Sequence, residues 1–436
     1  MAVDWPRTSL ADLSSEVSYG YTESASTDRI GPKFLRITDI QGGRVEWSAV
    51  PYCRIQTSDH ARYRLHEGDI VVARTGNSTG ENFCYLGGED AVFASYLIRF
   101  RVDPKQACAR YVFYNLRSEQ WWAYIRGSKT GSAQAGANAQ VLGRFSMPLP
   151  PLDEQRAIAS VLGALDDKID LNRRMCQTLE EMARVLFKSW FVDFDPVRAK
   201  MEGRDPGLPK EIADLFPSRL VDSELGPIPD GWRVQTFDDV LTISRSSIDP
   251  QEHQAERFAH YSIPAFDVGM RASIETGESI KSQKLLVSDR HVLISKLNPR
   301  TPRVWLPPQD GQLRQIASTE FLVCEPRHES GFTRTILYHA AASPRTIEFL
   351  AGNATGTSNS HQRVRPSDFL NYAFASPAIK LLTAFSEIAE PLHARIAAAR
   401  GESHTLAQTR DTLLPKLISG ELRVPASLGS MQEVAP

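Results

Sequence analysis

Two long stretches of the chain place apolar residues at alternating intervals of four and three positions. This spacing is typical of a helix that buries one seam of side chains against another helix. Asp153 and Glu154 supply negative charge at the start of the first stretch, and Ser376 followed by Pro377 is a start signal for the second. The first seam comprises Ile158, Leu162, Leu165, Ile169, Asn172, Cys176, Leu179, Ala183, Leu186 and Trp190, and the second comprises Phe385, Ala389, Leu392, Ile396, Ala399, Ser403, Leu406, Arg410, Leu413 and Leu417.

Two helices of equal length that each carry one apolar seam bury those seams most simply against each other. An antiparallel coiled coil of this kind would place a globular part at each end, with the two parts related by a pseudo-twofold axis. Asn172 and Arg410 are polar residues on the seams, and they fit a tolerated wet edge and a specified register equally well. Pro391 is predicted to bend the second helix, and Pro415 is predicted to bend or end it.

The sequence before each long helix indicates a globular part of mixed α/β class. Asp69 to Arg74 and Ser95 to Phe100 are strand-like, because they are rich in β-branched and aromatic residues. Both segments have counterparts in the second half of the chain, so the globular part occurs twice. The counterparts are His291 to Lys296 and Ser318 to Val323.

A glycine-rich loop also occurs twice, as Gly127 to Ser132 and as Gly352 to Thr357, 225 positions apart. Trp5 and Trp232 hold matching positions before the two globular parts. A period this long exceeds the roughly 20 to 50 residues of a solenoid unit, so it indicates two whole domains. The predicted divisions are residues 1–150 and 231–376 for the globular domains, 151–192 and 377–422 for the long helices, 193–230 for a Pro-rich connector, and 423–436 for a loose tail.

The composition is that of a globular protein, since 42% of the 436 residues are apolar and 23% are charged. The 50 basic and 52 acidic residues nearly cancel, so a nucleic acid would have to be bound by locally arranged cations or with help from another subunit. The sequence shows no signal-peptide pattern, no apolar run of about 18 residues, and no CxxC pair among its five cysteines. We therefore expect a cytoplasmic protein with reduced thiols.

Motifs that would support catalysis are missing from the sequence. Asn298-Pro299-Arg300 is the nearest match to the Asp/Asn-Pro-Pro-aromatic turn of an amino-methyltransferase, but it lacks the second proline and the aromatic residue. The chain has no GxxxxGK[ST] loop for nucleotide hydrolysis. Glu67 and Asp69 do not recur as an acidic pair in the second copy, which argues against a metal-dependent nuclease. The sequence thus predicts no catalytic residue and no metal site.

Four segments, in a fixed order along the chain, resemble the specificity subunits of type I restriction-modification systems. Together they span most of the sequence, from the entry of the first long helix to the end of the second. The segments are PLPPLDEQRAIA at residues 148–159 with its continuation LDDKID at 165–170, FVDFDP at 191–196, ELGPIPDGW at 224–232, and LLPKLISGEL at 413–422.

The resemblance implies two target-recognition domains, each of which reads one half of a split sequence in double-stranded DNA. It also implies that the helix pair acts as a ruler and as the docking surface for two modification (methyltransferase) subunits. Restriction (motor-nuclease) subunits would join the complex, and S-adenosylmethionine, ATP and Mg would be bound by these partners rather than by this chain. One departure is Phe374 to Pro377, which replaces the fuller PLPPLDEQ of the first copy and puts the equivalence of the two docking contacts in doubt.

Residues that read DNA bases need side chains able to form forked hydrogen bonds, chiefly Arg, Lys, Asn and Gln. Such residues gather in corresponding loops of the two domains, although polar residues beside glycine are more often solvated turns. Trp121 and Trp122 are expected to pack in the core rather than to stack on bases. The candidates are Arg74, Thr75, Asn77, Ser78, Lys129, Ser132, Gln134 and Asn138 in the first domain, and Lys296, Asn298, Arg300, Arg303, Asn359, His361, Gln362 and Arg363 in the second.

Two other classes of function stay open from the residues alone. A non-catalytic coiled-coil scaffold could join two copies of a partner, with globular parts that bind protein or RNA. A single-chain nuclease or methyltransferase would instead show activity in isolation with Mg²⁺ or a methyl donor.

Overall fold

The computed structural model describes residues 5–128, 137–308, 312–355 and 362–424. The chain forms two compact units. Unit 1 combines residues 1–171 with 402–436, and unit 2 comprises residues 172–401. No helix in the described ranges is both long and apolar enough to cross a membrane.

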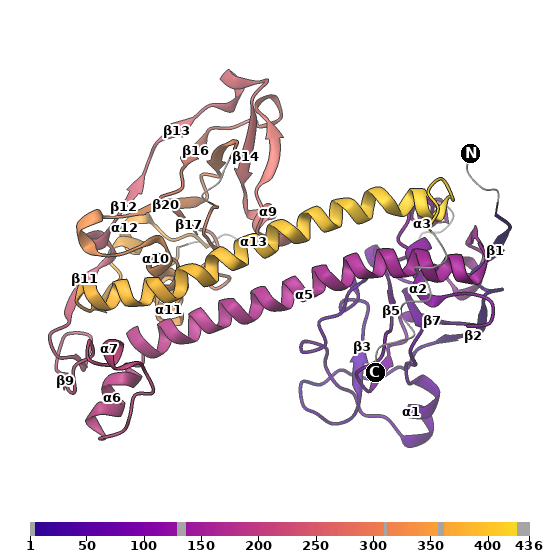
Figure 1. The fold of residues 1–436 in the computed structure, drawn as a ribbon, viewed down its shortest axis with the longest axis horizontal. Helices are drawn as coiled ribbons and strands as arrows, with labels where there is room; N and C mark the ends of the chain where they lie inside the picture. The colour runs from indigo at the N-terminus through magenta and orange to yellow at the C-terminus, as the bar shows by residue number, and fades with distance from the viewer. Residues whose placement is uncertain (1–4, 129–136, 309–311, 356–361, 425–436) are drawn as a thin grey trace. The chain divides into compact units, whose positions relative to one another are not determined.

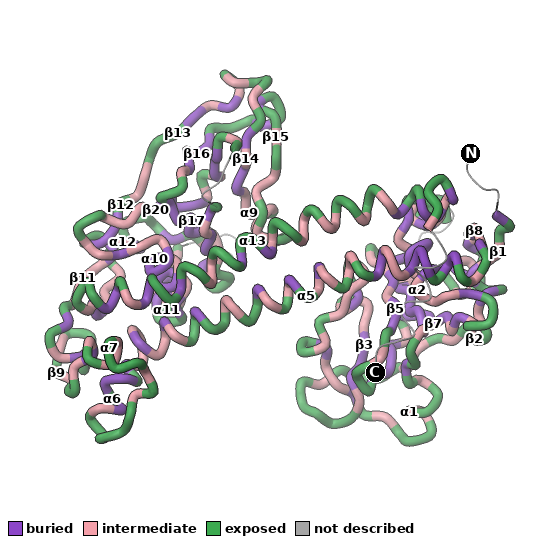
Figure 2. Tube along the Cα trace, viewed as in Figure 1, coloured by how far each residue is buried: buried purple, intermediate pink, exposed green. Residues whose placement is uncertain are grey.

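The two predicted seams lie on the helices α5 (Leu152–Phe191) and α13 (Ile379–Ile418), and every predicted seam position is buried or half-buried. Figure 2 shows buried positions recurring along both helices between exposed ones. Each unit contains one half of each helix, and the two halves run antiparallel (Figure 1). In unit 1, Ile158 and Leu162 pack with Leu414 and Leu417. In unit 2, Cys176 packs with residues of α13.

The two prolines of α13 do not interrupt the helix. The helix is continuous through Pro391 and ends at Ile418, three residues after Pro415. Pro415 therefore does not end the helix, and the bends expected at the two prolines stay predictions. A proline removes one helical hydrogen bond, and the burial of the seam on both sides of each proline offsets that loss. The Pro415 carbonyl still accepts a hydrogen bond from the Ser419 N–H at 3.1 Å.

The globular part of unit 1 is built on a four-stranded sheet with strand order β2-β7-β4-β5. The central strand β4 is buried along its whole length, because Ile70 and Val72 face one core cluster while Val71 and Ala73 face another. The strands are β1 (Arg7–Ser9), β2 (Ser14–Tyr19), β3 (Lys33–Leu35), β4 (Asp69–Ala73), β5 (Asn82–Cys84), β6 (Ala91–Phe93), β7 (Leu97–Val102) and β8 (Ser146–Pro148), and the helices are α1 (Thr57–Tyr63), α2 (Ala109–Asn115), α3 (Glu119–Ser128) and α4 (Ala139–Gly143).

Unit 2 repeats this plan with a sheet of the order β12-β20-β17-β18. A parallel pair accompanies the sheet in each unit, β3 with β6 in unit 1 and β14 with β19 in unit 2. The strands are β11 (Arg233–Thr236), β12 (Leu241–Ser244), β13 (Ser247–Ile248), β14 (Arg257–Tyr261), β15 (Ser273–Thr276), β16 (Lys284–Val287), β17 (Val292–Ser295), β18 (Val304–Trp305), β19 (Arg314–Ala317), β20 (Phe321–Pro326) and β21 (Ala373–Ser376), and the helices are α8 (Phe237–Val240), α9 (Ile263–Gly269), α10 (Arg334–Ala341), α11 (Pro344–Asn353) and α12 (Pro366–Leu370).

The register of the central strands shows which residues are equivalent in the two units. Ala73 pairs with Leu97 in unit 1, and Ser295 pairs with Phe321 in unit 2. The predicted match of residues 69–74 to 291–296 therefore agrees with the register. The match of residues 95–100 to 318–323 is wrong by one position, because β7 and β20 are buried on both faces and lack the alternation that fixes a register.

The Pro-rich connector is ordered and belongs to unit 2. It contains α6 (Asp195–Met201), α7 (Lys210–Ala213), β9 (Leu220–Val221) and β10 (Ile228–Pro229). Phe194, Val197 and Phe216 pack in the same hydrophobic cluster as the end of α5. The connector thus extends the core of unit 2.

Candidate nucleic-acid interface

In unit 1 the loop after β4 begins at Arg74, whose backbone forms hydrogen bonds with two other segments of the chain. Its N–H donates to the Tyr96 carbonyl at 3.1 Å, and its own carbonyl accepts from the Ala137 N–H at 2.9 Å. The loop after β4 is therefore joined to the segment that begins at Ala137, where Asn138 caps α4.

The Arg74 side chain is held on two sides. Its Nε donates to the Ser95 carbonyl at 3.1 Å, and its guanidinium lies 5.2 Å from the centre of the Tyr19 ring, within cation–π range. Arg74 forms no ion pair with any residue that the structure describes. Tyr19 is exposed, and so is Tyr96, whose backbone carbonyl accepts from the Arg74 N–H. The result is a cation held beside one exposed aromatic ring.

The rest of this loop is supported from behind by α3. The Trp121 indole donates to the Gly80 carbonyl at 2.9 Å, and a Cβ on Gly80 would lie 2.9 Å from Ile125. Trp121 is fully buried, which confirms its predicted core role. At the loop surface the Ser78 hydroxyl accepts from Gln41 at 3.2 Å, and Asn77 is exposed.

Lys296 of unit 2 occupies the position of Arg74. Its N–H donates to the Glu320 carbonyl at 2.8 Å, and its carbonyl accepts from the Val364 N–H at 2.9 Å, so the same backbone junction occurs in both units. The two junctions differ in their side chains, because a guanidinium fork at one site is replaced by an ammonium group at the other.

The loop after β17 lies beside the segment that begins at Gln362. Asn298 adopts a left-handed backbone conformation with φ of 50°, and its N–H donates to the Gln362 carbonyl at 2.9 Å. Arg363 pairs with Glu320 at 2.8 Å, and this contact lowers the pKa of the Glu320 carboxyl. The structure therefore brings Lys296, Asn298, Gln362 and Arg363 together.

The predicted residues differ in their surroundings. Arg300 is exposed, whereas the side chain of Arg303 is only 12% exposed and pairs with Asp267 of α9 at 2.6 Å. Arg303 therefore fixes α9 to the loop after β17. Thr75 and Ser78 are half-buried. Lys129, Ser132, Gln134, Asn359 and His361 lie outside the described residues.

Sequence reasoning missed several residues at these surfaces. Tyr19, Gln41 and Tyr96 come from other strands and loops of unit 1, and only the fold places them beside the loop after β4. An exposed tyrosine gives a weak sequence signal, because most aromatic residues are buried.

The described residues contain no group of three or more His, Cys, Asp or Glu side chains placed to hold a metal ion. All five cysteines lie in the described ranges and are free. Burial raises the pKa of the Cys84 thiol to about 12, which leaves it protonated and inert.

Each globular part makes a partly buried hydrogen bond to a long helix at an equivalent position. In unit 1, the Tyr114 hydroxyl of α2 donates to Asp166 of α5 at 2.9 Å. In unit 2, the Nε2 atoms of His339 in α10 and His393 in α13 are 2.9 Å apart. We call these contacts the unit 1 joint and the unit 2 joint.

The polar residue Arg410 on the second seam belongs to the unit 1 joint. It pairs with Asp166 at 2.6 Å, and Arg44 approaches the same carboxylate at 3.4 Å. Asn172, the polar residue on the first seam, is buried, and its Nδ2 donates to the Ala399 carbonyl at 3.4 Å. Asn172 therefore does not lie at a wet edge, whereas the Arg410 side chain is 24% exposed.

Burial dominates the electrostatics of the joints. It lowers the pKa of His339 to about 3 and that of His393 to about 4, so the unit 2 joint is neutral at pH 7. Burial and the neighbouring Asp166 carboxylate raise the pKa of Tyr114 above its ordinary value.

Comparison with known proteins gives a consistent family. The model of the type I restriction modification DNA specificity domain matches residues 34–181. The HindI specificity subunit of Haemophilus influenzae is 22% identical over 96% of this chain and 100% of its own length. The MjaIX specificity subunit of Methanocaldococcus jannaschii is 24% identical over 82% of this chain and 76% of its own length.

A solved structure shares the fold. The crystal structure of the type I restriction-modification S subunit from M. genitalium covers 95% of this chain and 96% of its own, with a TM-score of 0.58 and 14% sequence identity. The likeness of fold extends over both halves of the chain. The chain is thus similar in sequence to the specificity subunits of type I restriction-modification systems over most of its length, and it shares their fold.

Proposed function

We propose that the chain is the sequence-specific DNA-binding subunit of a type I restriction-modification complex and that it reads a bipartite target. The observation that carries this proposal is the duplicated backbone junction at Arg74 and Lys296. Two recognition surfaces share one framework and present different side chains, as expected for readers of two different half-sites.

The chain acts without catalysing a reaction. Methyl transfer, ATP hydrolysis and DNA cleavage belong to the modification and restriction subunits, which hold S-adenosylmethionine, ATP and Mg, and the complex works in the cytoplasm. Docking of partners is supported by Met182 and Val185 on α5, which are 54% and 51% exposed and border an apolar groove of about 960 Å³ in unit 2.

The decisive experiment maps methylated sites in DNA from cells that express this chain with its modification subunit. We expect two short half-sites separated by a fixed gap. Methylation without sequence preference, together with equal binding to specific and random duplexes in a competition assay, would overturn the proposal and favour a scaffold that binds protein or RNA.

The helix pair is proposed to set the gap between the half-sites. Removing two helical turns, seven residues within Ile158 to Leu186, should change the gap or abolish assembly while the preference of each half-site persists. A changed half-site with an unchanged gap would contradict the ruler role.

A further inference from the structure

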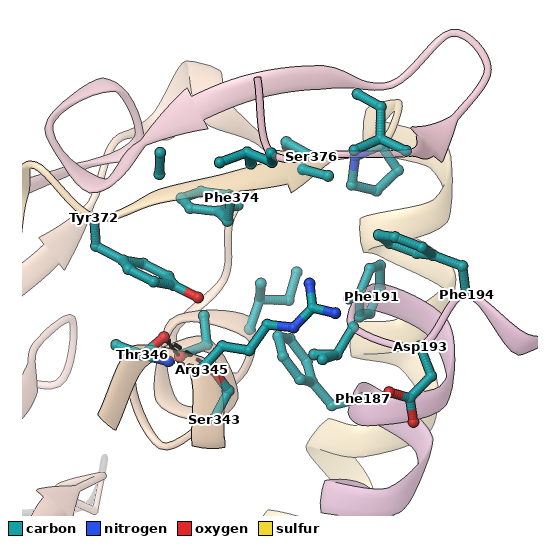
Figure 3. A pocket seen from close by; sticks show the side chains of 18 of the residues that line it. Phe187, Phe191, Asp193, Phe194, Ser343, Arg345, Thr346, Tyr372, Phe374 and Ser376 are labelled. Carbon is teal, nitrogen blue, oxygen red and sulfur yellow. Dashed lines mark hydrogen bonds between the residues drawn. The ribbon is translucent and has the colours of Figure 1, made fainter. Parts of the chain in front are cut away.

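Unit 2 contains a cavity of about 620 Å³ where α5 ends. Phe187 and Phe191 of α5 form one wall, the start of α11 forms another, and β21 lies along the cavity (Figure 3). The side chains of Tyr372 and Arg345 lie at the cavity in the same view. The space therefore combines aromatic walls with the backbone of a strand.

One edge of β21 is open. Among the described strands β21 pairs only with β11, and the ladder continues with a bond from the Phe237 N–H to the Tyr372 carbonyl at 3.1 Å. Alternate residues of an antiparallel strand direct their N–H and C=O away from the partner strand, and this register assigns that role to Ala373 and Ala375. Both residues line the cavity.

The equivalent edge of unit 1 is closed. The two-stranded ladder of β1 and β8 has the same register, so Ser146 and Pro148 face outward there. The Pro148 carbonyl accepts from the Tyr111 hydroxyl at 2.8 Å, and the Ser146 carbonyl accepts from Arg7. Proline has no N–H to offer, so this edge cannot take another strand.

Smaller side chains open the space in unit 2. Ser118 and Ser343 are equivalent helix caps in the two units, because the hydroxyl of each accepts a hydrogen bond at 3.3 Å from the backbone N–H three positions later. Counting from these caps shows which residues correspond. Ile336 replaces the tyrosine that closes the edge in unit 1, so the hydroxyl donor is lost. The three replacements from unit 1 to unit 2 are Tyr111 by Ile336, Asn115 by Ala340, and Trp121 by Thr346.

The cavity is lined by two arginines that outnumber its one unpaired aspartate. Arg198 and Arg345 are exposed, and neither forms an ion pair within the described part of the chain. Asp193 is already paired with Lys188, which leaves Asp195 as an exposed acidic residue among those that line the cavity.

We propose that an extended segment of a modification subunit adds as a third strand to the open edge of β21. The segment places apolar side chains against Phe187 and Phe191 and a carboxylate against Arg345. This inference rests on the proposed function for the identity of the partner. It makes the two ends of the helix pair chemically different docking sites, because unit 1 offers no such edge.

The test uses Ala375→Pro in the full chain with purified modification subunit. The variant copies Pro148, which the equivalent strand of unit 1 accommodates, so the fold should be kept. We expect affinity for one of the two modification subunits to fall about tenfold or more, because a main-chain hydrogen bond is lost and a donor is removed. Ala375→Ser retains the N–H and should bind as the parent chain does.

Two further measurements decide the proposal. Amide exchange of the segment that holds Ala373 and Ala375 should slow when the modification subunit binds, and Arg345→Glu should weaken binding and reduce its dependence on salt. If Ala375→Pro binds as tightly as Ala375→Ser and these amides stay unprotected, the inference fails while the function stands. If the parent complex shows no DNA sequence preference, the proposed function fails instead.

Discussion

The two units share one fold but fix it to the long helices with different chemistry. Tyr114 and His339 each lie six residues after the cap of equivalent helices, at Cys108 and Thr333. Asp166 and His393 each lie 14 residues after the start of their long helix. A charged joint supported by an arginine in unit 1 and a neutral histidine joint in unit 2 therefore make the same connection between a globular part and a long helix. A duplicated framework preserves the geometry of the contact and leaves its chemistry free to diverge.

The first test breaks the unit 1 joint with Asp166→Ala. The change leaves Arg410 and Tyr114 without their shared partner inside the helix pair. Because the Asp166 side chain is 19% exposed, we expect a loss of about 2–3 kcal/mol rather than the full cost of a stranded buried charge. Urea denaturation measures the loss.

Asp167→Ala is the matched control for this experiment. Asp167 is adjacent on α5 and pairs with Arg110, but its side chain is 58% exposed. We expect a loss below about 1 kcal/mol. Equal losses for the two variants would show that the unit 1 joint is no more than a surface ion pair.

The second test uses pH to separate the joints. His339 and His393 have folded-state pKa values lowered to about 3 and about 4, below the ordinary value of 6.5. Below pH 6.5 the two histidines bind protons in the unfolded chain but stay neutral in the folded one. The free energy of unfolding of unit 2 should therefore fall by up to about 1.4 kcal/mol per pH unit for each histidine. Arg334 and Arg400, which also disfavour protonation of His393, strengthen this trend.

Unit 1 should respond in the opposite direction. The pKa of Tyr114 is raised in the fold, so this contribution is complete below pH 10 and is lost as the pH rises above it. Proteolysis of each unit in urea, followed at pH 5 and pH 7.5, should show an acid-dependent loss in unit 2 alone. The double variant His339→Gln, His393→Gln should remove most of that dependence, and an unchanged dependence would refute the assignment.

The third test asks whether the junction residues read DNA. Arg74→Ala should relax one base position in one half-site, and Lys296→Ala should relax the other half-site only. A good base contact contributes about 1–3 kcal/mol of discrimination, which corresponds to roughly tenfold to hundredfold. Methylation mapping with each variant measures the effect. Uniform weakening at all positions would assign these residues to phosphate contacts instead.

The long helices could be predicted because a seam of period 3.5 leaves a signal at every turn, and the structure confirms them with seam positions that are all buried or half-buried. The equivalence of Arg74 and Lys296 was also visible, since each follows a mostly apolar strand. The contacts of Tyr19 and Gln41 were not visible, because their partners lie 55 and 37 positions away in sequence. The sequence pattern also places the polar Arg410 on the seam, but it does not show that Arg410 pairs with Asp166.

The smallest expected effect concerns Asn172 on the first seam. Its amide donates to the Ala399 carbonyl at 3.4 Å, a long contact that stabilises the helix pair little. Asn172→Leu should therefore change the free energy of unfolding by less than about 1 kcal/mol, since apolar burial offsets the lost polar contact.

If Asn172 specifies the register of the helix pair, the leucine variant should keep its stability but shift the pairing of the two helices. Disulfide trapping between Cys176 and a cysteine introduced at Ile396, neighbours in unit 2, measures that shift. Efficient trapping in both the parent and the leucine background would assign Asn172 to packing alone.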